Sequence, residues 1–291
     1  MVEMTRTHFI GIDGGGTGCR VAIAVSSGEV IGRGESGAAN ATTDMDATIR
    51  HILDALAEAA DDAGLPEPEL ANAVAHAGVA GVLSDEQSQK IEDAMPMATT
   101  VTEDCVTALH GALGKRDGIL ISLGTGTLIG QSRKGHQSFI GGWGLKLSDQ
   151  ASAGWLGKTL LSEVLMIHDG LAPPTALSRD VMHQFGGDPK AIVTFAAAAA
   201  PSELAALAPK VTEAAGKSDP LALSLMQTAA TYLSDAIDTL GLGRKEVLCL
   251  TGGLGPRYTN WLLPNHRKHL ADPEGNALDG ALRLAFEAGA S

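Results

Sequence analysis

The sequence is poor in cysteine and in aromatic residues. Its three cysteines, Cys19, Cys105 and Cys249, are far apart and form neither a Cys-x-x-Cys pair nor a zinc-ligand spacing. This excludes a disulfide framework and suits a reducing cytoplasm. The chain has only three Trp, two Tyr and five Phe among 291 residues. A chain of this length can still bury a core without covalent or metal crosslinks.

Basic residues and long apolar runs are also scarce. The chain has 21 basic and 34 acidic residues, a net charge of −13. Such a surface repels phosphate backbones and anionic lipids, so we expect no nucleic-acid or membrane partner. The apolar run from Phe9 to Ile12 stops at Asp13, and no window approaches the ~18 apolar residues of a membrane span. We therefore expect a cytoplasmic protein without a leader peptide.

Several catalytic motifs are missing. There is no GxxxxGK[ST] phosphate loop, no GxSxG elbow and no HExxH pair, which argues against a P-loop ATPase, an α/β-hydrolase and a zinc peptidase. Residues 14–19 read GGGTGC but precede a strand-like alternation, so they do not fit a dinucleotide fingerprint. Glycine, by contrast, is abundant: 36 residues, about 12 % against a typical ~7 %.

Predicted strands and helices alternate in two similar halves, each opening with strand, glycine turn and strand. In the first half, strands are expected within 8–25, at 30–33, 72–80 and 99–103, and helices at 45–63 and 104–113. In the second half, strands are expected at 118–123, 128–131 and 246–251, and helices at about 150–168, across 175–240 and at 276–288. This order indicates an α/β duplication.

The hinge between the halves is expected near 111–118, where GALGKRDG gathers glycine and charge. We therefore predict an N-terminal lobe over 1–112 and a C-terminal lobe over 113–275. The last helix, within 276–291, is expected to join the N-terminal lobe.

The first glycine turn is Asp13-Gly14-Gly15-Gly16-Thr17. Consecutive glycines permit positive φ and let main-chain N–H groups approach a ligand closely. The Asp13 carboxylate could hold Mg²⁺, which prefers one or two carboxylates together with phosphate oxygens. Taken alone, the motif could also be an ordinary hairpin turn.

Two further glycine turns follow later in the chain. Gly124-Thr125-Gly126-Thr127 again lies between predicted strands and offers phosphate donors with hydroxyls, although a plain hairpin would also account for it. Gly252 and Gly253 follow the strand at 246–251, where a nucleotide's base and ribose could lie against bare main chain.

Together, the three turns resemble the two phosphate motifs and the adenosine motif of the actin, heat-shock chaperone and sugar-kinase ATPase superfamily. The segments FIGIDGGGTGCR, ESGAAN, VTEDCVTAL, SLGTGT, GGWGLKLSDQASAGW and LTGGLG resemble its BadF/BadG/BcrA/BcrD branch over essentially the whole chain. The branch includes bacterial glucosamine kinases and N-acetylglucosamine kinases. The resemblance implies an actin-like, ribonuclease H-like α/β fold, with duplicated βββαβαβα lobes around a nucleotide cleft.

The resemblance also implies an ATP- and Mg²⁺-dependent hexosamine kinase. Asp104, at a strand-to-helix junction, matches the family's catalytic aspartate and would accept the proton of the attacking 6-hydroxyl. The same residue could instead be a simple helix cap, and Glu103 beside it is a rival carboxylate. The sugar-binding positions implied by the family are Asn40, Asp104, Trp143, Gly144 and Asp149, although Asn40 could be a turn residue and Trp143 a core residue.

Glucosamine, converted to glucosamine 6-phosphate, is the expected substrate, because SDQASAG and HDGLAPPTAL look most like bacterial glucosamine kinase. GGWG favours N-acetylglucosamine instead. Outside the kinases, the chain could be an ATPase that activates a partner enzyme, a sugar-binding regulator or a nucleotide switch. The cysteines do not match the iron–sulfur ligands of the activators, and the first predicted strand leaves no room for a helix-turn-helix before it. Dimers are common in this branch, so a homodimer is an open expectation.

Overall fold

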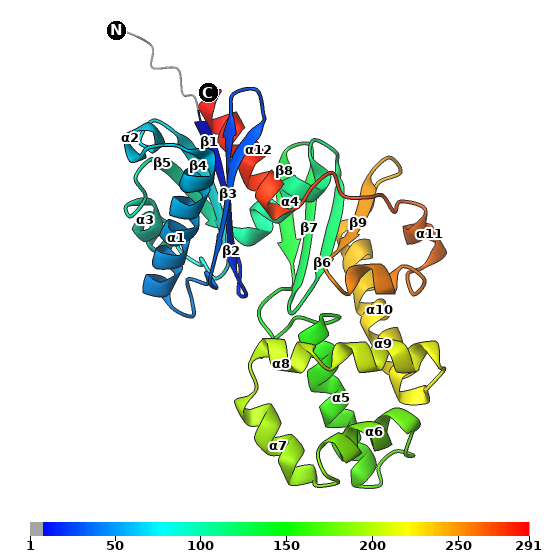
Figure 1. The fold of residues 1–291 in the computed structure, drawn as a ribbon. Coiled ribbons are helices and arrows are strands. Elements are labelled where there is room, and N and C mark those ends of the chain that lie inside the picture. Colours follow the sequence, from blue (N-terminus) through cyan, green and yellow to red (C-terminus); the bar gives the residue numbers. More distant parts are fainter. Residues whose placement is uncertain (1–7, 291) are drawn as a thin grey trace. The chain divides into compact units, whose positions relative to one another are not determined.

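The computed structural model describes residues 8–290, and the chain divides into two compact units. The first unit comprises residues up to Lys115 together with residues from Pro273 onward, and the second runs from Arg116 to Asp272 (Figure 1). The expectation of no leader peptide concerns N-terminal residues that lie mostly outside this described range. Within that range, no helix combines the length and the apolar character needed to cross a membrane.

The first unit contains a five-stranded sheet in the order β3-β2-β1-β4-β5. The strands are β1 (His8–Gly14), β2 (Cys19–Val25), β3 (Val30–Ser36), β4 (Val74–Val79) and β5 (Ala98–Glu103). β1, β4 and β5 run parallel to one another, whereas β2 and β3 are antiparallel additions at one edge. β1 and β4 are short apolar runs, as expected for strands that are covered on both faces, whereas β5 at the edge of the sheet is more polar and buries only Val101.

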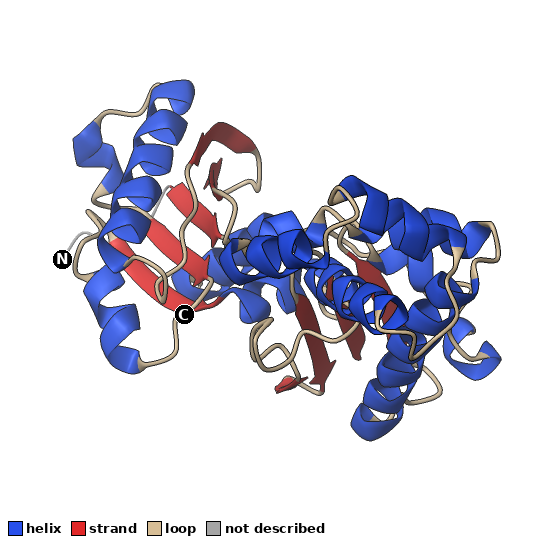
Figure 2. Ribbon diagram, turned by 90° about the horizontal axis from the view of Figure 1, so that it is seen from below, coloured by secondary structure: helices blue, strands red, loops and turns tan. Residues whose placement is uncertain are grey.

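Helices cover both faces of this sheet (Figure 2). Ile10 and Ile12 pack into a core with Ile52, and the opposite face packs against Leu278 and Leu282. At Gly11, an added Cβ would lie 2.7 Å from the main-chain nitrogen of Leu282, so the last helix rests directly on the strand. The helices are α1 (Met45–Ala63), α2 (Glu67–Leu70), α3 (Asp85–Glu92), α4 (Asp104–Leu113) and α12 (Ala277–Gly289).

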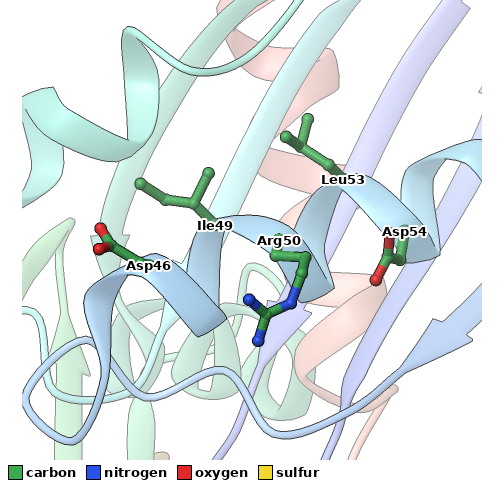
Figure 3. Close-up of a pocket in the computed structure, with 5 residues that line it drawn as sticks. All are labelled: Asp46, Ile49, Arg50, Leu53 and Asp54. Carbon is green, nitrogen blue, oxygen red and sulfur yellow. The ribbon is translucent and has the colours of Figure 1, made fainter.

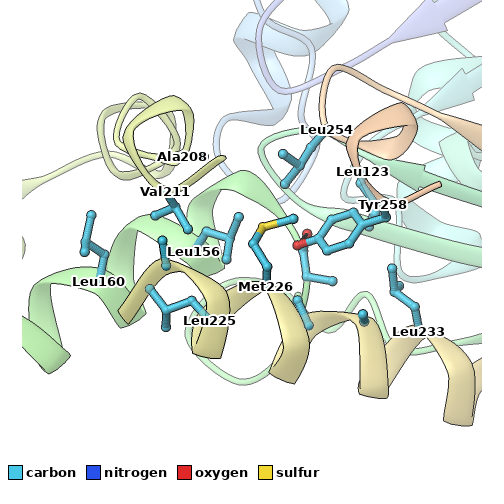
Figure 4. Packing of buried hydrophobic residues seen from close by; sticks show 14 of the residues in the cluster. Leu123, Leu156, Leu160, Ala208, Val211, Leu225, Met226, Leu233, Leu254 and Tyr258 are labelled. Atoms are coloured by element: carbon cyan, nitrogen blue, oxygen red, sulfur yellow. Dashed lines mark hydrogen bonds between the residues drawn. The ribbon is translucent and has the colours of Figure 1, made fainter. Parts of the chain in front are cut away.

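The second unit contains a four-stranded sheet in the order β8-β7-β6-β9. The strands are β6 (Gly118–Leu123), β7 (Thr127–Arg133), β8 (His136–Ile140) and β9 (Val247–Thr251). Ile119, Ile121 and Leu123 face a core of helical residues, part of which Figure 4 shows. The helices are α5 (Ala153–His168), α6 (Ala176–Gln184), α7 (Pro189–Ala198), α8 (Pro201–Ala205), α9 (Ala208–Gly216), α10 (Pro220–Leu240), the 3₁₀ helix η1 (Gly255–Tyr258) and α11 (Pro264–Arg267).

The α/β class and the duplicated arrangement expected from the sequence are confirmed. Both units begin with three consecutive strands, and in both a later strand pairs in parallel with the first of them. Within residues 8–290, the second sheet has four strands, one fewer than the first. Next to β9 there is only an isolated bridge between Leu248 and Leu270 in place of a fifth strand. Within the described residues, none of the three cysteines forms a disulfide.

Candidate active site

The predicted residues of the first unit gather at one edge of its sheet. β1, β4 and β5 are parallel, so their carboxyl ends meet at the same edge, where open α/β sheets bind ligands. The glycine turn follows β1, and Asp104 follows β5 directly. Asn40 forms an isolated bridge with Ala80, the residue after β4. The sheet topology thus assembles three segments that are up to 90 residues apart in the sequence.

The first glycine turn offers open main chain. Gly14, Gly15 and Gly16 do not have positive φ, so the turn does not use the left-handed conformations that glycine permits. Position 14 favours glycine because the space there is limited: an added Cβ on Gly14 would lie 3.1 Å from the Cβ of Ala39. The N–H groups of Gly16 and Thr17 find no acceptor within residues 8–290. These exposed donors can therefore receive an anion.

The Asp13 side chain is largely buried, with 13 % of its surface exposed, and it forms an ion pair with Arg20 on β2. The two residues are direct partners in the β1–β2 register. Within the described residues, no group of three or more His, Cys, Asp or Glu side chains could hold a metal ion without help. A single carboxylate beside an anion-binding turn still fits Mg²⁺, which takes most of its remaining ligands from phosphate and water.

Asp104 is the first residue of α4, and Glu103 before it occupies the N-cap position. Burial raises the pKa of Asp104 to about 6, and the negative charge of Asp13 adds to this effect. The N–H group of Cys105 lowers this pKa to a smaller degree. A carboxylate with a pKa closer to neutrality suits a general base. The rival Glu103 is exposed and accepts a weak bond from the Cys105 thiol.

Asn40 is half-buried, and its side chain shapes its own loop. Its Oδ1 accepts hydrogen bonds from the N–H groups of Thr42 (3.1 Å) and Thr43 (3.2 Å), the pattern of an Asx turn. The interpretation of Asn40 as a turn residue is therefore correct for this oxygen. The Nδ2 group has no acceptor among residues 8–290, and it can still donate to a ligand.

In the second unit, the turn between β6 and β7 is attached to the start of α5. The carbonyls of Gly124 and Thr125 accept hydrogen bonds from Ala153 (2.9 Å) and Gly154 (3.1 Å). The Thr127 hydroxyl is buried and donates to the carbonyl of Gln150 at 2.7 Å. A phosphate at this turn would consequently meet the Thr125 hydroxyl and main-chain N–H groups more readily than the Thr127 hydroxyl.

The loop between β8 and α5 carries the other predicted sugar residues. Trp143 is 76 % exposed, so the hypothesis of a core tryptophan is wrong. Asp149 is 7 % exposed; burial raises its pKa, while the N–H groups of Thr127 and Gly144 lower it. Part of this loop borders a groove of about 630 Å³, lined by Ile140, Gly141, Trp143, Leu147, Ser148, Gln150, Tyr232, Asp235, Ala236 and Thr239.

The third glycine turn lies at the same edge as the second, because β6 and β9 are parallel. Gly252 has a φ of 76°, and an added Cβ there would lie 2.4 Å from the carbonyl oxygen of Leu123. Only glycine fits this position, and Gly253 beside it faces open space. Tyr258, which the sequence did not single out, is fully buried and donates its hydroxyl to the carbonyl of Ala151 at 3.1 Å. Tyr258 and Ala151 are 107 residues apart in the sequence, so no local sequence pattern could have predicted this hydrogen bond.

A separate hollow of about 350 Å³ lies on the exposed face of α1 (Figure 3). It is lined by Asp46, Ile49, Arg50, Leu53 and Asp54, and Asp46 also pairs with Lys90 on α3 at 3.0 Å. None of the predicted site residues lines this hollow, so the glycine turns and carboxylates at the edge of each sheet remain the candidate sites of the two units.

Comparison with known proteins identifies the family of the chain. The model of the BadF/BadG/BcrA/BcrD ATPase family matches residues 10–281. The chain is 31 % identical to glucosamine kinase GspK of Vibrio cholerae over 280 residues, covering 96 % of this chain and 95 % of that protein. It is 27 % identical to N-acetyl-D-glucosamine kinase of Dictyostelium discoideum, covering 86 % of both chains.

A solved structure from Chromobacterium violaceum, provisionally named as an N-acetylglucosamine kinase, superposes with a TM-score of 0.87. Its sequence is 32 % identical, and the match covers 97 % of this chain and 99 % of that one. The fold is therefore that of the actin-like ATPases and sugar kinases.

Proposed function

Because the chain belongs to the BadF/BadG/BcrA/BcrD ATPase family, we propose that it is an ATP-dependent amino-sugar kinase. The observation that carries the proposal is the edge of the first sheet. There, a glycine turn with open N–H groups lies at the same edge as Asp104, whose pKa is raised to about 6. A phosphate-binding turn and a proton acceptor are the two functions that transfer of a phosphoryl group to a sugar hydroxyl requires.

In this proposal, Asp104 accepts the proton of the 6-hydroxyl as that oxygen attacks the γ-phosphate of ATP. Most of the remaining work is positioning and charge stabilisation. The N–H groups of Gly16 and Thr17 bind phosphate oxygens, while Gly14 and Gly15 form the start of that turn. The turn of Gly124, Thr125, Gly126 and Thr127 binds phosphate as well. Gly252 and Gly253 provide bare main chain for the nucleoside. Asp13 would hold Mg²⁺, which neutralises phosphate charge when bound.

We propose glucosamine as the preferred sugar, with N-acetylglucosamine as the second candidate. The similarity to a glucosamine kinase at 31 % identity over nearly the whole chain supports the first, and the Dictyostelium relative supports the second. Asn40, Trp143, Gly144 and Asp149 are the proposed sugar-binding residues beside Asp104. An exposed tryptophan is suited to stacking against a sugar ring, since its apolar face would otherwise stay in water.

The test is ATP turnover in a coupled assay with glucosamine, N-acetylglucosamine, N-acetylmuramate, glucose or no sugar. Strong stimulation by one amino sugar would support the proposal and decide between its two forms. Equal ATP hydrolysis in every well would reject it in favour of a partner-activating ATPase or a nucleotide switch.

Asp104→Asn tests the proposed base directly. The amide keeps the size of the side chain but cannot accept the proton, so we expect kcat to fall by about 10²-fold or more. ATP binding should persist, because Asp104 has no proposed role in it, and a nucleotide-binding titration of the variant checks this. Normal turnover by Asp104→Asn would contradict the assignment.

A further inference from the structure

Residues 149–151, here called the strained segment, twice leave the usual backbone conformations. Asp149 has a φ of 62° and Ala151 a φ of 68°, in the left-handed region. This conformation is unfavourable for any residue that carries a side chain. Only four non-glycine residues within 8–290 have a positive φ, and two of them lie here. Such a conformation persists only where surrounding contacts hold it.

The first set of contacts joins the strained segment to the phosphate turn at 124–127. The Thr127 hydroxyl donates to the carbonyl of Gln150 at 2.7 Å. An added Cβ on Gly126 would lie 3.0 Å from Oδ2 of Asp149, so the carboxylate lies directly against the turn. The turn and the segment therefore cannot move independently.

The second contact comes from the other glycine turn of this unit. Tyr258 ends the short η1 helix that follows Gly252 and Gly253, and its hydroxyl donates to the carbonyl of Ala151 at 3.1 Å. Its ring lies in the core among Leu123, Leu254 and Met226 (Figure 4). Tyr258 is 0 % exposed, so it cannot touch a ligand. Burial also raises the pKa of Tyr258, which keeps the hydroxyl protonated and able to donate.

Further main-chain bonds complete the connection. The N–H of Ser152 donates to the carbonyl of Asp149 (3.1 Å), and the next two N–H groups, at the start of α5, bind the carbonyls of Gly124 and Thr125. At the other end, the N–H of Leu254 donates to the carbonyl of Leu123 (3.0 Å), the last residue before the phosphate turn. The Tyr258 hydrogen bond therefore completes a set of contacts that connects the turn at 124–127, the strained segment and the turn at Gly252 and Gly253.

We propose that Tyr258 is a positioning residue for phosphoryl transfer. Its hydroxyl holds the carbonyl of Ala151, and through the strained segment it keeps the turn at 124–127 in the conformation that receives phosphate. Asp149 acts in the same network, with its carboxylate packed against Gly126. The kinetic part of this inference rests on the proposed kinase function, whereas its structural part concerns the turn alone.

The test is Tyr258→Phe, which removes the hydroxyl and keeps the ring in the core. Loss of one buried hydrogen bond predicts a fall in kcat of about five- to tenfold. The KM for the sugar should change less than twofold, because no sugar contact is removed. Hydrogen–deuterium exchange should become faster in peptides covering 124–127 and 149–152, and stay unchanged in peptides from α12, which belongs to the other unit.

Thr194→Val is the matched control, since it also removes a hydroxyl that donates to a main-chain carbonyl, in this case that of Lys190 at 3.0 Å on α7. It should leave kcat and the exchange of both peptides unchanged. A merely structural Tyr258 would lower Tm without changing kcat or the exchange of the turn at temperatures well below Tm, and that result would overturn the proposal.

The proposed function and this inference fail in different ways. A wild-type protein without sugar-dependent turnover would reject the kinase function. The exchange measurement needs no substrate, so unchanged exchange at 124–127 in folded Tyr258→Phe would reject the positioning role whether or not the protein is a kinase.

Discussion

Asp104 and Asp149 are both shielded aspartates with raised pKa values, but their surroundings suit different tasks. Asp104 stands at a strand end, and the charge of Asp13 adds to the effect of burial. Asp149 is packed against Gly126, and the N–H groups of Thr127 and Gly144 oppose the rise in its pKa. Both carboxylates accept main-chain N–H groups, but only Asp104 is also repelled by a neighbouring carboxylate, which makes it the better suited of the two to accept a proton.

The raised pKa of Asp104 predicts the acid limb of the activity profile. The deprotonated carboxylate is the active form, so activity is lost as pH falls through the pKa of about 6. We expect kcat/KM to be level above this pH and to fall about tenfold per unit below it. A profile that stays level down to pH 4.5 would show that the group titrates like an ordinary aspartate. The residual activity of Asp104→Asn should not show this fall at low pH, because the variant has no carboxyl group at position 104.

At the scale of whole elements, strong local signals in the sequence predicted the structure correctly. α1 occupies the predicted range 45–63, because its apolar residues recur at helical spacing and Asp44 caps its first turn with a hydrogen bond to Ala47. β8 was missed, because His136-Gln137-Ser138 has no apolar alternation and the strand is an exposed edge. The helical region expected across 175–240 is interrupted after Ala198, since Pro201 disfavours a helical conformation at Ala200.

The contact between β4 and α4 depends on one glycine. An added Cβ on Gly78 would lie 2.0 Å from Oγ1 of Thr107, three residues after Asp104 on the same helix. Gly78→Ala should therefore push the start of α4 outward, at a cost of about 1–3 kcal/mol in the free energy of unfolding. Because Asp104 moves with the helix, kcat should fall as well. Urea denaturation and steady-state kinetics measure the two effects.

Gly216→Ala is the control for this substitution. Gly216 ends α9 without a positive φ, and nothing lies within 4 Å of an added Cβ. Its replacement should leave stability within about 1 kcal/mol of the wild type. Equal effects of the two substitutions would mean that crowding at Thr107 is not the cause. Adding Thr107→Ala to Gly78→Ala should recover part of the loss, since it removes the atoms nearest to the new methyl group.

At the scale of the whole molecule, the chain completes its first unit only with its last helix. α12 packs on β1 at Gly11 and on α4, where an added Cβ on Gly280 would lie 1.9 Å from the carbonyl of Thr107. The sequence led us to expect that the last helix joins the N-terminal lobe. It could not indicate Tyr258 or the strained segment, because those depend on tertiary contacts between segments whose separation leaves no periodic pattern.

The second unit should therefore be separable from the rest of the chain. Its first and last residues lie together, since the guanidinium of Arg116 donates to the carbonyl of Asp272 at 3.1 Å. We expect a fragment of residues 116–272 to unfold cooperatively, because it retains its own sheet and the whole core around Ile121 and Leu233. Circular dichroism during heating checks this.

The matching fragment of residues 1–115 should fail the same measurement. Without α12, it exposes the apolar surface of Ala22 and Ala24, which Leu278 and Leu282 cover in the full chain. Joining residue 115 to residue 273 through a short Gly/Ser linker should restore a cooperative transition, because α12 then returns to Gly11. If residues 1–115 melted cooperatively without α12, the last helix would be an accessory to the first unit. Failure of both 1–115 and the linked protein would instead show that the first unit needs the second in order to fold.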